Sequence, residues 1–319
     1  MELGYVLRRA WEIAWRHKVL WLFGFLVALG SGTSGQGNVN YRRSVGELPP
    51  EMQRAIYEFV TSPYFVVAVL ILVALGLVIG LVLAFVGALG RAALVDQVRE
   101  AEEGGLPAVG AGFQAGWQRM WPVFLIRFLL RLPVVLLALI GTLPGLVGTL
   151  SMLPDSRPDA PPPPNIILIF GSLFACLLPA ACLVVLLSIP LSVLERLSIR
   201  ACVLERLPLG ESLKRGWSVL TGNLGSIALL WLILLGIGIG VALVIGLPLA
   251  LGVFAALVPL VLTAMASPIL AAVLALAVGL VAWLLGAAIG SIVETFTSAT
   301  WTLAYRELTG LGLTGEESA

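Results

Sequence analysis

One acidic side chain lies well inside an apolar segment of this sequence, and hydroxyl groups accompany it. Around Glu294, the residues Ser291, Thr295, Ser298 and Thr302 recur at helical spacing, so one face of the last apolar run carries a polar stripe. A charged group at the bilayer centre costs about 2.5 to 3.5 kcal/mol, and such groups usually face a bundle interior or water. The stripe is therefore a candidate lining for the path of a proton or a polar substrate.

A second interpretation gives Glu294 a structural role. The residue stands about 26 positions beyond Pro268, which brings it nearer to the inner boundary of a membrane than to its midplane. At that depth it would lie beside lipid headgroups and pair with an arginine such as Arg127 or Arg131. Both interpretations stay open at the level of the sequence.

Basic residues gather where apolar runs begin or end, and they are candidate contacts for anionic lipid headgroups. Arg127 and Arg131 are one helical turn apart, directly before the apolar stretch 132–150, and long side chains at that depth reach lipid phosphates. The candidate contacts are Arg127, Arg131, Arg200, Lys214 and Arg215, with Arg196 beside them. The alternative is ordinary anchoring by positive charge on the inner side.

Residues suited to catalysis or metal binding are scarce. The sequence holds one histidine, His17, between Arg16 and Lys18, and three cysteines without a Cys-x-x-Cys spacing. It contains no His-Glu-x-x-His motif, phosphate-binding loop or Gly-x-Ser-x-Gly motif. We therefore expect a protein that is not an enzyme and that uses no cofactor and no metal. The balance of 19 basic against 18 acidic residues gives no reason to expect nucleic acid as a partner.

The composition is that of a polytopic membrane protein. Apolar residues make up 59% of the chain and charged residues 12%, with a mean hydropathy of +1.03, whereas soluble domains have about 45 to 50% and about 25%. A helix needs about 20 apolar residues to cross the hydrocarbon core. We predict an all-α integral membrane protein, one transmembrane domain over residues 1–319, with six transmembrane helices. Their apolar runs are 19–30, 64–90, 122–150, 166–194, 224–247 and 268 to about 298.

Residues 249–266 are apolar as well, but Pro259 interrupts them and they do not fit this count. They form a seventh span, a re-entrant segment or an apolar cap at the outer face. A seventh span would place the C-terminus and Arg306 on the outer side, so the cap is the favoured interpretation.

The distribution of Lys and Arg predicts the orientation in the membrane. Fifteen of the 19 basic residues fall in four segments, which the positive-inside rule places in the cytoplasm. Those segments are 1–18, 91–131, 195–222 and 303–319. Both termini are then cytoplasmic, and the membrane is the inner membrane of a bacterium. The loop 31–63, with a short surface helix around 50–60, and the Pro-rich stretch 154–164 face outward.

A pattern of five residues occurs three times, about one hundred residues apart. Each copy places them at i, i+4, i+7, i+8 and i+11, on one face of an amphipathic helix before an apolar run. The copies are Leu3, Leu7, Ala10, Trp11, Ala14; Val109, Phe113, Gly116, Trp117, Met120; and Leu209, Leu213, Gly216, Trp217, Leu220. We predict three repeat units, approximately 1–104, 105–206 and 207–319, each an amphipathic helix plus a hairpin, around a pseudo-threefold axis.

Glycines four residues apart predict where the spans pack closely, because small residues let membrane helices approach each other. The pairs in apolar runs are Gly76–Gly80, Gly141–Gly145, Gly236–Gly240 and Gly286–Gly290.

Two short segments carry a resemblance to a known group. Arg91-Ala92-Ala93-Leu94-Val95 with Gly116-Trp117, and the echoes Arg200-Ala201-Cys202-Val203 with Gly216-Trp217, resemble uncharacterised bacterial six-span membrane proteins. Some of these are labelled as the membrane domain of glycerophosphodiester phosphodiesterase. The resemblance implies the architecture and no active-site residue, because the link to glycerophospholipid metabolism holds only for members with a catalytic barrel. The likeness to mitochondrial carriers is geometric only, since their Pro-x-acidic-x-x-basic signature is missing.

The expected function is that of a non-enzymatic, lipid-associated scaffold or accessory subunit. The alternative is a small permease or lipid-handling transporter with a polar path near Glu294. A water-accessible cavity that reaches Glu294 would favour transport, whereas a dry core of Leu, Val and Gly would favour the scaffold. The expected partners are membrane lipids, including anionic headgroups on the cytoplasmic side, and a protein that the sequence does not identify.

Overall fold

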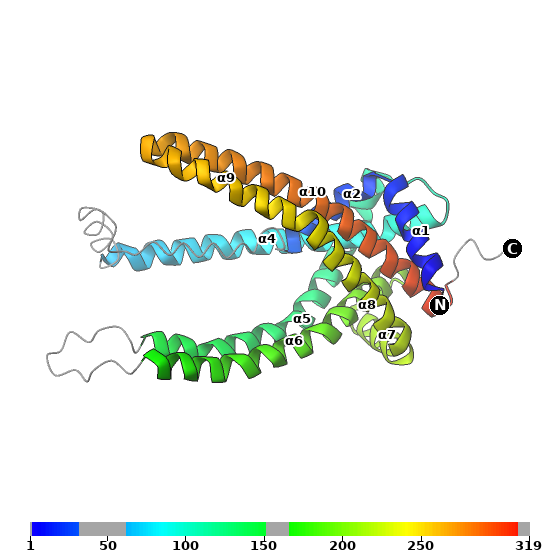
Figure 1. The fold of residues 1–319 in the computed structure, drawn as a ribbon. Helices are drawn as coiled ribbons and strands as arrows, with labels where there is room; N and C mark the ends of the chain where they lie inside the picture. Colours follow the sequence, from blue (N-terminus) through cyan, green and yellow to red (C-terminus); the bar gives the residue numbers. More distant parts are fainter. Residues whose placement is uncertain (1, 32–61, 151–165, 312–319) are drawn as a thin grey trace. The chain divides into compact units, whose positions relative to one another are not determined.

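A computed structural model describes residues 2–31, 62–150 and 166–311, and this part of the chain is built of helices without a strand (Figure 1). The predicted all-α class is therefore confirmed. The predicted outer segments 50–60 and 154–164 lie outside the described residues. The helices are α1 (Leu3–Arg16), α2 (Val19–Ser31), α4 (Pro63–Glu102), α5 (Val109–Leu150), α6 (Ile166–Leu204), α7 (Leu209–Gly222), α8 (Leu224–Val241), η2 (Ala242–Gly246), α9 (Leu247–Ala266) and α10 (Pro268–Thr309).

Several helices are long and apolar enough to cross a membrane. Within the described ranges there are five such stretches, and the pair α1 and α2 passes the same test only together, across a bend of 100°. The five stretches are Val67–Glu102, Val109–Gly141, Ala181–Leu204, Leu224–Ala256 and Val273–Thr309. The chain is therefore a multi-pass membrane protein, and the predicted sixth span depends on the bent pair.

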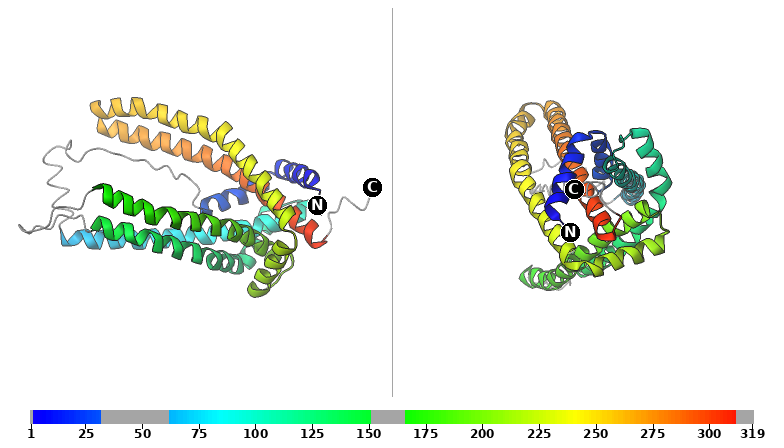
Figure 2. Two further views of the ribbon diagram at one scale, coloured as in Figure 1. Left: turned by 60° about the horizontal axis from the view of Figure 1, so that its bottom comes forward. Right: turned by 90° about the vertical axis from the view of Figure 1, so that its right-hand side faces the viewer.

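Long helices pair into antiparallel hairpins. α5 and α6 lie side by side, and so do α9 and α10, which are joined at Ser267 (Figure 1, Figure 2). α5 and α10 have 42 residues each. At about 1.5 Å per residue they are about 60 Å long, twice the ~30 Å hydrocarbon core, so part of each helix extends beyond it.

Two compact units make up the chain. The terminal unit comprises residues 2–120 and 229–300, and the middle unit comprises residues 121–228 with the segment from 301 on. In the terminal unit α2 packs along α4, and in the middle unit α6 packs on α7. A single transmembrane domain over residues 1–319 stays a prediction.

Burial is concentrated at the polar ends of the long helices, whereas their apolar parts are exposed. In α4 every residue from Val69 to Leu83 is exposed, but most of 88–98 is buried. α6 and α10 show the same division, with most buried residues from Val193 and Ser291 onward. A helix that is apolar and exposed on all faces is stable in lipid and not in water.

Helices α8, η2 and α9 form one continuous helix from Leu224 to Ala266. η2 is a π-helical turn just before Pro248. A proline lacks the N–H for the usual helical bond, and its ring clashes with the carbonyl four residues earlier, so the backbone widens there. Pro259 lies inside α9 without ending it. The expectation of a separate outer cap at 249–266 is therefore wrong, because this segment continues α8 and leads through Ser267 into α10.

The predicted amphipathic helices form, with one exception. α1 and α7 are separate helices of 14 residues each. The second copy, 109–120, is not separate, because it forms the first turns of α5 and continues into the span. His17 and Lys18 stand at the first break, whereas the apolar Val123 and Phe124 occupy the corresponding place in α5 and favour an unbroken helix.

Two of the predicted glycine pairs are not where the described helices meet. Among the described residues no neighbouring atom lies within 4 Å of a methyl group placed on Gly76, Gly80, Gly236 or Gly240, whereas one on Gly290 would lie 3.9 Å from Ala28 of α2. Close approach instead occurs in the terminal unit, where Gly30 of α2 meets Gly87 of α4 backbone to backbone. In this unit the close contacts between helices are therefore made by the short helix α2.

Candidate membrane-interface site

The copies of the repeated pattern bury the same face of their helices. The buried residues are Val6, Ala10, Ile13 and Ala14 in α1, and Ser212, Gly216, Val219 and Leu220 in α7. Both sets have the spacing i, i+4, i+7 and i+8. At the start of α5, Gly112 and Gly116 are buried at the first two of these positions. The copies therefore share a buried face, but it is not the face of the five predicted positions. Of those positions only the small residue at i+7 is buried in every copy, and the tryptophan at i+8 is exposed in each.

The small residue at the second position packs against the polar end of a long helix. A methyl group on Gly116 would lie 2.7 Å from the backbone oxygen of Leu89 in α4, and one on Gly216 would lie 3.0 Å from the backbone nitrogen of Ser198 in α6. The first distance is shorter than side-chain carbons adopt, and the second is tighter than most such contacts. In the first copy Ala10 is fully buried, and the adjacent Trp11 lies edge-on to Phe296 of α10, with ring centroids 5.9 Å apart.

A tryptophan follows each small residue and is exposed. Trp11, Trp117 and Trp217 are 52%, 61% and 55% exposed. Trp15 and Trp121 stand one turn further along the first two copies and are exposed as well. An indole combines a large apolar ring with a polar N–H, which suits the lipid headgroup layer. The three copies therefore present exposed indoles that are candidate interfacial anchors.

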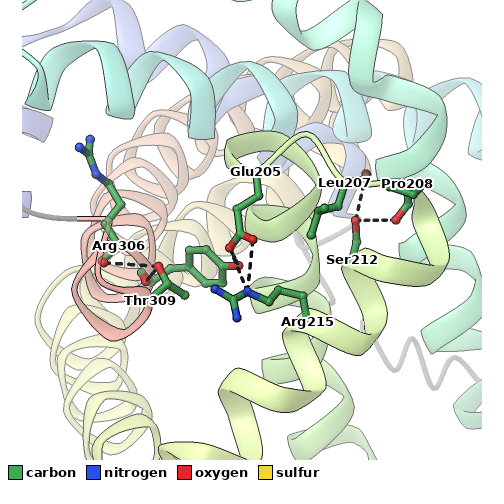
Figure 3. Close-up of polar contacts among 8 residues, drawn as sticks. Glu205, Leu207, Pro208, Ser212, Arg215, Arg306 and Thr309 are labelled. Carbon is green, nitrogen blue, oxygen red and sulfur yellow. Dashed lines mark hydrogen bonds and ion pairs between the residues drawn. The ribbon is translucent and has the colours of Figure 1, made fainter.

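An arginine precedes the small residue in two copies and ties its helix to a long helix. Arg9 Nε lies 3.0 Å from Glu102 Oε2, and the Glu102 side chain is buried. Arg215 Nε lies 3.2 Å from Glu205 Oε2, just beyond the end of α6 (Figure 3). Glu205 Oε1 also accepts a hydrogen bond from the hydroxyl of Tyr305, a buried residue of α10 (2.5 Å).

Hydrogen bonds at the helix starts complete these attachments. In α7 the buried Ser212 hydroxyl lies 3.1 Å from the backbone oxygen of Leu207 and 2.9 Å from that of Pro208 and donates to them (Figure 3). Ala115 stands where the other copies have arginine, and there Gln97 Oε1 of α4 accepts a hydrogen bond from the Ala108 N–H (2.9 Å). This bond satisfies a backbone donor at the start of α5 that the helix leaves unpaired.

The charges around these helices shift two pKa values in opposite directions. The hydrogen bond to Glu205 raises the pKa of Arg215, against the opposing effect of burial. Burial lowers the pKa of His17 at the end of α1, and the positive charges of Arg16 and Arg9 lower it further. The end of α1 therefore disfavours another positive charge.

Two arginines of α5 share one carboxylate of α6. Arg127 Nε lies 3.5 Å from Glu195 Oε1, and Arg131 Nε lies 3.3 Å from Glu195 Oε2. The side chains of Arg127 and Glu195 are 8% and 11% exposed, whereas that of Arg131 is 52% exposed. Arg131 is therefore the exposed member of the cluster, directly before the apolar part of α5.

The other predicted lipid contacts lie in different surroundings. Lys214 is exposed on α7, and Arg215 is partly exposed while it pairs with Glu205. Arg200 is buried, and its guanidinium donates to the backbone oxygen of Arg196 (2.7 Å). The structure therefore does not place Arg200 where a headgroup reaches it. The Arg196 guanidinium lies 5.8 Å from the ring centre of Trp301.

The predicted polar stripe on α10 takes part in helix packing. The Thr295 hydroxyl is buried and lies 3.2 Å from the backbone oxygen of Leu20 in α2 and 2.7 Å from that of Ser291. A methyl group on Gly24 of α2 would meet both Ser291 and Thr295, so α2 approaches α10 closely there. Ser291, Ser298 and Thr302 are buried as well.

Glu294, the acidic member of the stripe, is only partly buried. Arg127 and Arg131, its expected partners, belong to the middle unit, where both pair with Glu195, so the pairing with Glu294 stays a prediction. Among the described residues of its own unit, Glu294 forms no ion pair or hydrogen bond. It lines neither the apolar groove of about 420 Å³ between α9 and α10 nor the hollow around Phe113 and Trp117.

Reasoning from the sequence missed the acidic partners Glu102, Glu195 and Glu205. One signal was available, because Arg-Ala-Trp at 9–11 and Arg-Gly-Trp at 215–217 repeat the arginine together with its neighbours. The acidic partners carry no such signal. Glu102 lies in the last turn of α4, whereas Glu205 lies beyond the end of α6.

Comparison with known proteins gives a family but no activity. A family model described as a family of unknown function (DUF7544) matches residues 7–316, nearly the whole chain. No curated protein and no solved structure matches the chain at a significant level. The expected likeness to uncharacterised proteins is confirmed in this coarser form, and the comparisons show no link to glycerophosphodiester phosphodiesterase.

Proposed function

The chain belongs to this family of unknown function, and from that premise we propose that it is a non-enzymatic scaffold or accessory subunit that associates with the lipids of a bacterial inner membrane. The observation that carries the proposal is the repeated interface element, a buried small residue on a helix end with an exposed tryptophan beside it. Such an element holds a helix at the headgroup layer and contributes no nucleophile or acid–base pair.

The same element supports the finer architecture of the proposal. The shared burial pattern of α1, α7 and the start of α5 favours three repeated units around a pseudo-threefold axis. Three equivalent helices that seat on the same lipid layer must lie on one side of the membrane. With the bias in Lys and Arg, that side is the cytoplasm, and both termini lie there.

Cysteine labelling in membrane vesicles tests this arrangement. Arg8→Cys, Gln114→Cys and Lys214→Cys each place a thiol at an exposed position of one copy, in a chain whose three native cysteines are replaced by alanine. An impermeant maleimide should label all three from the cytoplasmic side only. Leu77→Cys, in the exposed apolar part of α4, is the matched control and should react from neither side. Labelling that divides the three thiols between opposite sides contradicts the proposal.

A second candidate function is transport of a proton or polar solute past Glu294. One observation favours it, namely that this partly buried carboxylate lacks an ion pair in its own unit although it lies in a candidate span. In proteoliposomes under a potassium diffusion potential, such a path should acidify the lumen, and Glu294→Gln should abolish that flux. Glu12→Gln, on the exposed face of α1, is the control. A flux equal to that of protein-free vesicles leaves the scaffold as the function.

A further inference from the structure

We propose that Arg131, supported by Arg127, binds the phosphate of one anionic phospholipid whose acyl chain lies along α5. The inference rests on the proposed function, because it takes this part of α5 to lie at the lipid headgroups. It goes further by assigning one site and one class of ligand, a phosphate ester joined to an acylated glycerol.

Arg131 keeps a guanidinium edge that Glu195 does not occupy. Two guanidinium groups of α5 share this one carboxylate of α6, and Arg131 contacts it through Nε. Arg127 is held inside, whereas Arg131 is half exposed and can turn its remaining donors to a ligand. A guanidinium presents paired N–H groups that match two oxygens of a phosphate. The exposed edge of Arg131 is therefore complementary to a singly charged phosphodiester.

An exposed apolar strip lies next to Arg131 on α5. Val135 and Leu139 follow at i+4 and i+8 on the same face of α5, and they are 53% and 57% exposed. Phe128 lies one turn before Arg131 and is exposed as well. A soluble phosphate gains nothing from such a strip, whereas the acyl chain below a bound headgroup covers it. The ligand is therefore a lipid.

Changes at Glu195 distinguish a lipid-binding cluster from one that only joins two helices. Its carboxylate neutralises part of the positive charge, so it competes with a phosphate for Arg131. Removing the carboxylate should strengthen lipid binding, and removing Arg131 should weaken it. A cluster that only joins α5 to α6 predicts that neither change alters lipid affinity.

Native mass spectrometry of the full chain in mild detergent, titrated with phosphatidylglycerol, tests the site. Arg131→Gln should weaken phosphatidylglycerol binding about fivefold, the effect of one charge at a membrane surface. Its weaker binding of phosphatidylcholine should not change. Glu195→Gln should strengthen phosphatidylglycerol binding severalfold. Arg119→Gln, the same change earlier on α5, is the matched control and should leave both lipids at the wild-type affinity.

Further arms keep the test decisive. Glu195→Gln leaves the buried Arg127 without this counter-ion and so affects folding. If Glu195→Gln does not fold, the lipid affinity of Arg131→Lys is measured in its place. The lysine keeps the charge but lacks the paired donors, so its affinity for phosphatidylglycerol should fall between those of wild type and Arg131→Gln. Millimolar glycerol phosphate should not displace bound lipid, and displacement would identify a site for a free phosphate ester.

Two results overturn the proposal: an Arg131→Gln variant that binds phosphatidylglycerol as well as wild type does, or a wild-type chain that does not distinguish the two lipids. Vesicle labelling does not depend on Arg131. If the three interfacial thiols share one side while Arg131→Gln has no effect, the lipid site fails and the proposed function stands. If the thiols divide between sides, the proposed function fails whatever the lipid titration gives.

Discussion

Arg215, Gly216 and Trp217 are consecutive in α7, yet their side chains have three different surroundings. The arginine pairs with a carboxylate, the glycine packs against α6, and the tryptophan is exposed. Successive side chains point about 100° apart around an α-helix, so one turn holds a tether, a contact point and an anchor. Residues 9–11 repeat this arrangement in α1.

A methyl group at the contact point should be costly. We expect Gly216→Ala to destabilise the protein by about 1 to 3 kcal/mol, as overpacking in a tight contact does. The added carbon would lie 3.0 Å and 3.1 Å from the backbone nitrogen and Cα of Ser198, which cannot move without displacing α6. Thermal unfolding in detergent measures the loss. Gly210→Ala in the same helix has no atom within 4 Å of its added methyl and should unfold like wild type; equal unfolding of the two variants would contradict the close contact.

At this scale the sequence predicts the repeated small residues and tryptophans, but not the acidic partners. A repeated spacing reports a helix face directly. The ion pairs join residues 10 positions apart at Arg215–Glu205 and 93 apart at Arg9–Glu102, and no local pattern encodes them. The pairs Gly76–Gly80 and Gly236–Gly240 make no such contact for the same reason, because a contact depends on which helix lies opposite.

Among the elements, the bend between α1 and α2 is held by specific bonds. The Trp21 Nε1–H donates to the backbone oxygen of Ala14 across the bend (2.8 Å), and the Leu20 N–H donates to that of His17 (3.0 Å). His17 is the one histidine of the chain and stands at the bend itself. Protonation of His17 therefore affects the stability of the bend between α1 and α2.

The pH should change the stability of this bend through His17. Burial and the charges of Arg16 and Arg9 lower the pKa of His17 below its ordinary value of 6.5. The unfolded chain then binds the proton more readily, so this contribution to stability is complete above pH 6.5 and is lost as the pH falls through the folded-state pKa. The thermal midpoint of wild type should fall more between about pH 7.5 and 5 than that of His17→Gln. NMR titration of the ring gives the pKa directly, and a value at or above 6.5 disproves the shift.

The long helices show where predictions for elements succeeded and where they failed. The length of the apolar run predicted four long helices correctly, because the predicted runs lie within α4, α5, α6 and α10. Pro259 was misleading, because the rule that proline ends a helix comes from proteins in water. Membrane helices tolerate proline, since neighbouring groups and local widening satisfy the freed carbonyls. The π-helical turn before Pro248 is such an adjustment.

For the molecule as a whole, composition predicted a multi-pass membrane protein correctly, but not the number of crossings. The number depends on the N-terminal end, where α2 has 13 residues. At 1.5 Å per residue it is about 20 Å long, shorter than the ~30 Å hydrocarbon core. Whether a short helix of this kind completes a crossing depends on its neighbours, and α2 packs along α4. No count of apolar residues contains that information.

The arrangement of tether, contact point and anchor makes the number of residues between them a requirement in its own right. One residue inserted between Arg215 and Gly216 would rotate the preceding turns by about 100° relative to those that follow. The guanidinium would then leave Glu205 while the glycine kept its place against α6. A single insertion or deletion would therefore put one half of the helix out of phase with its partners.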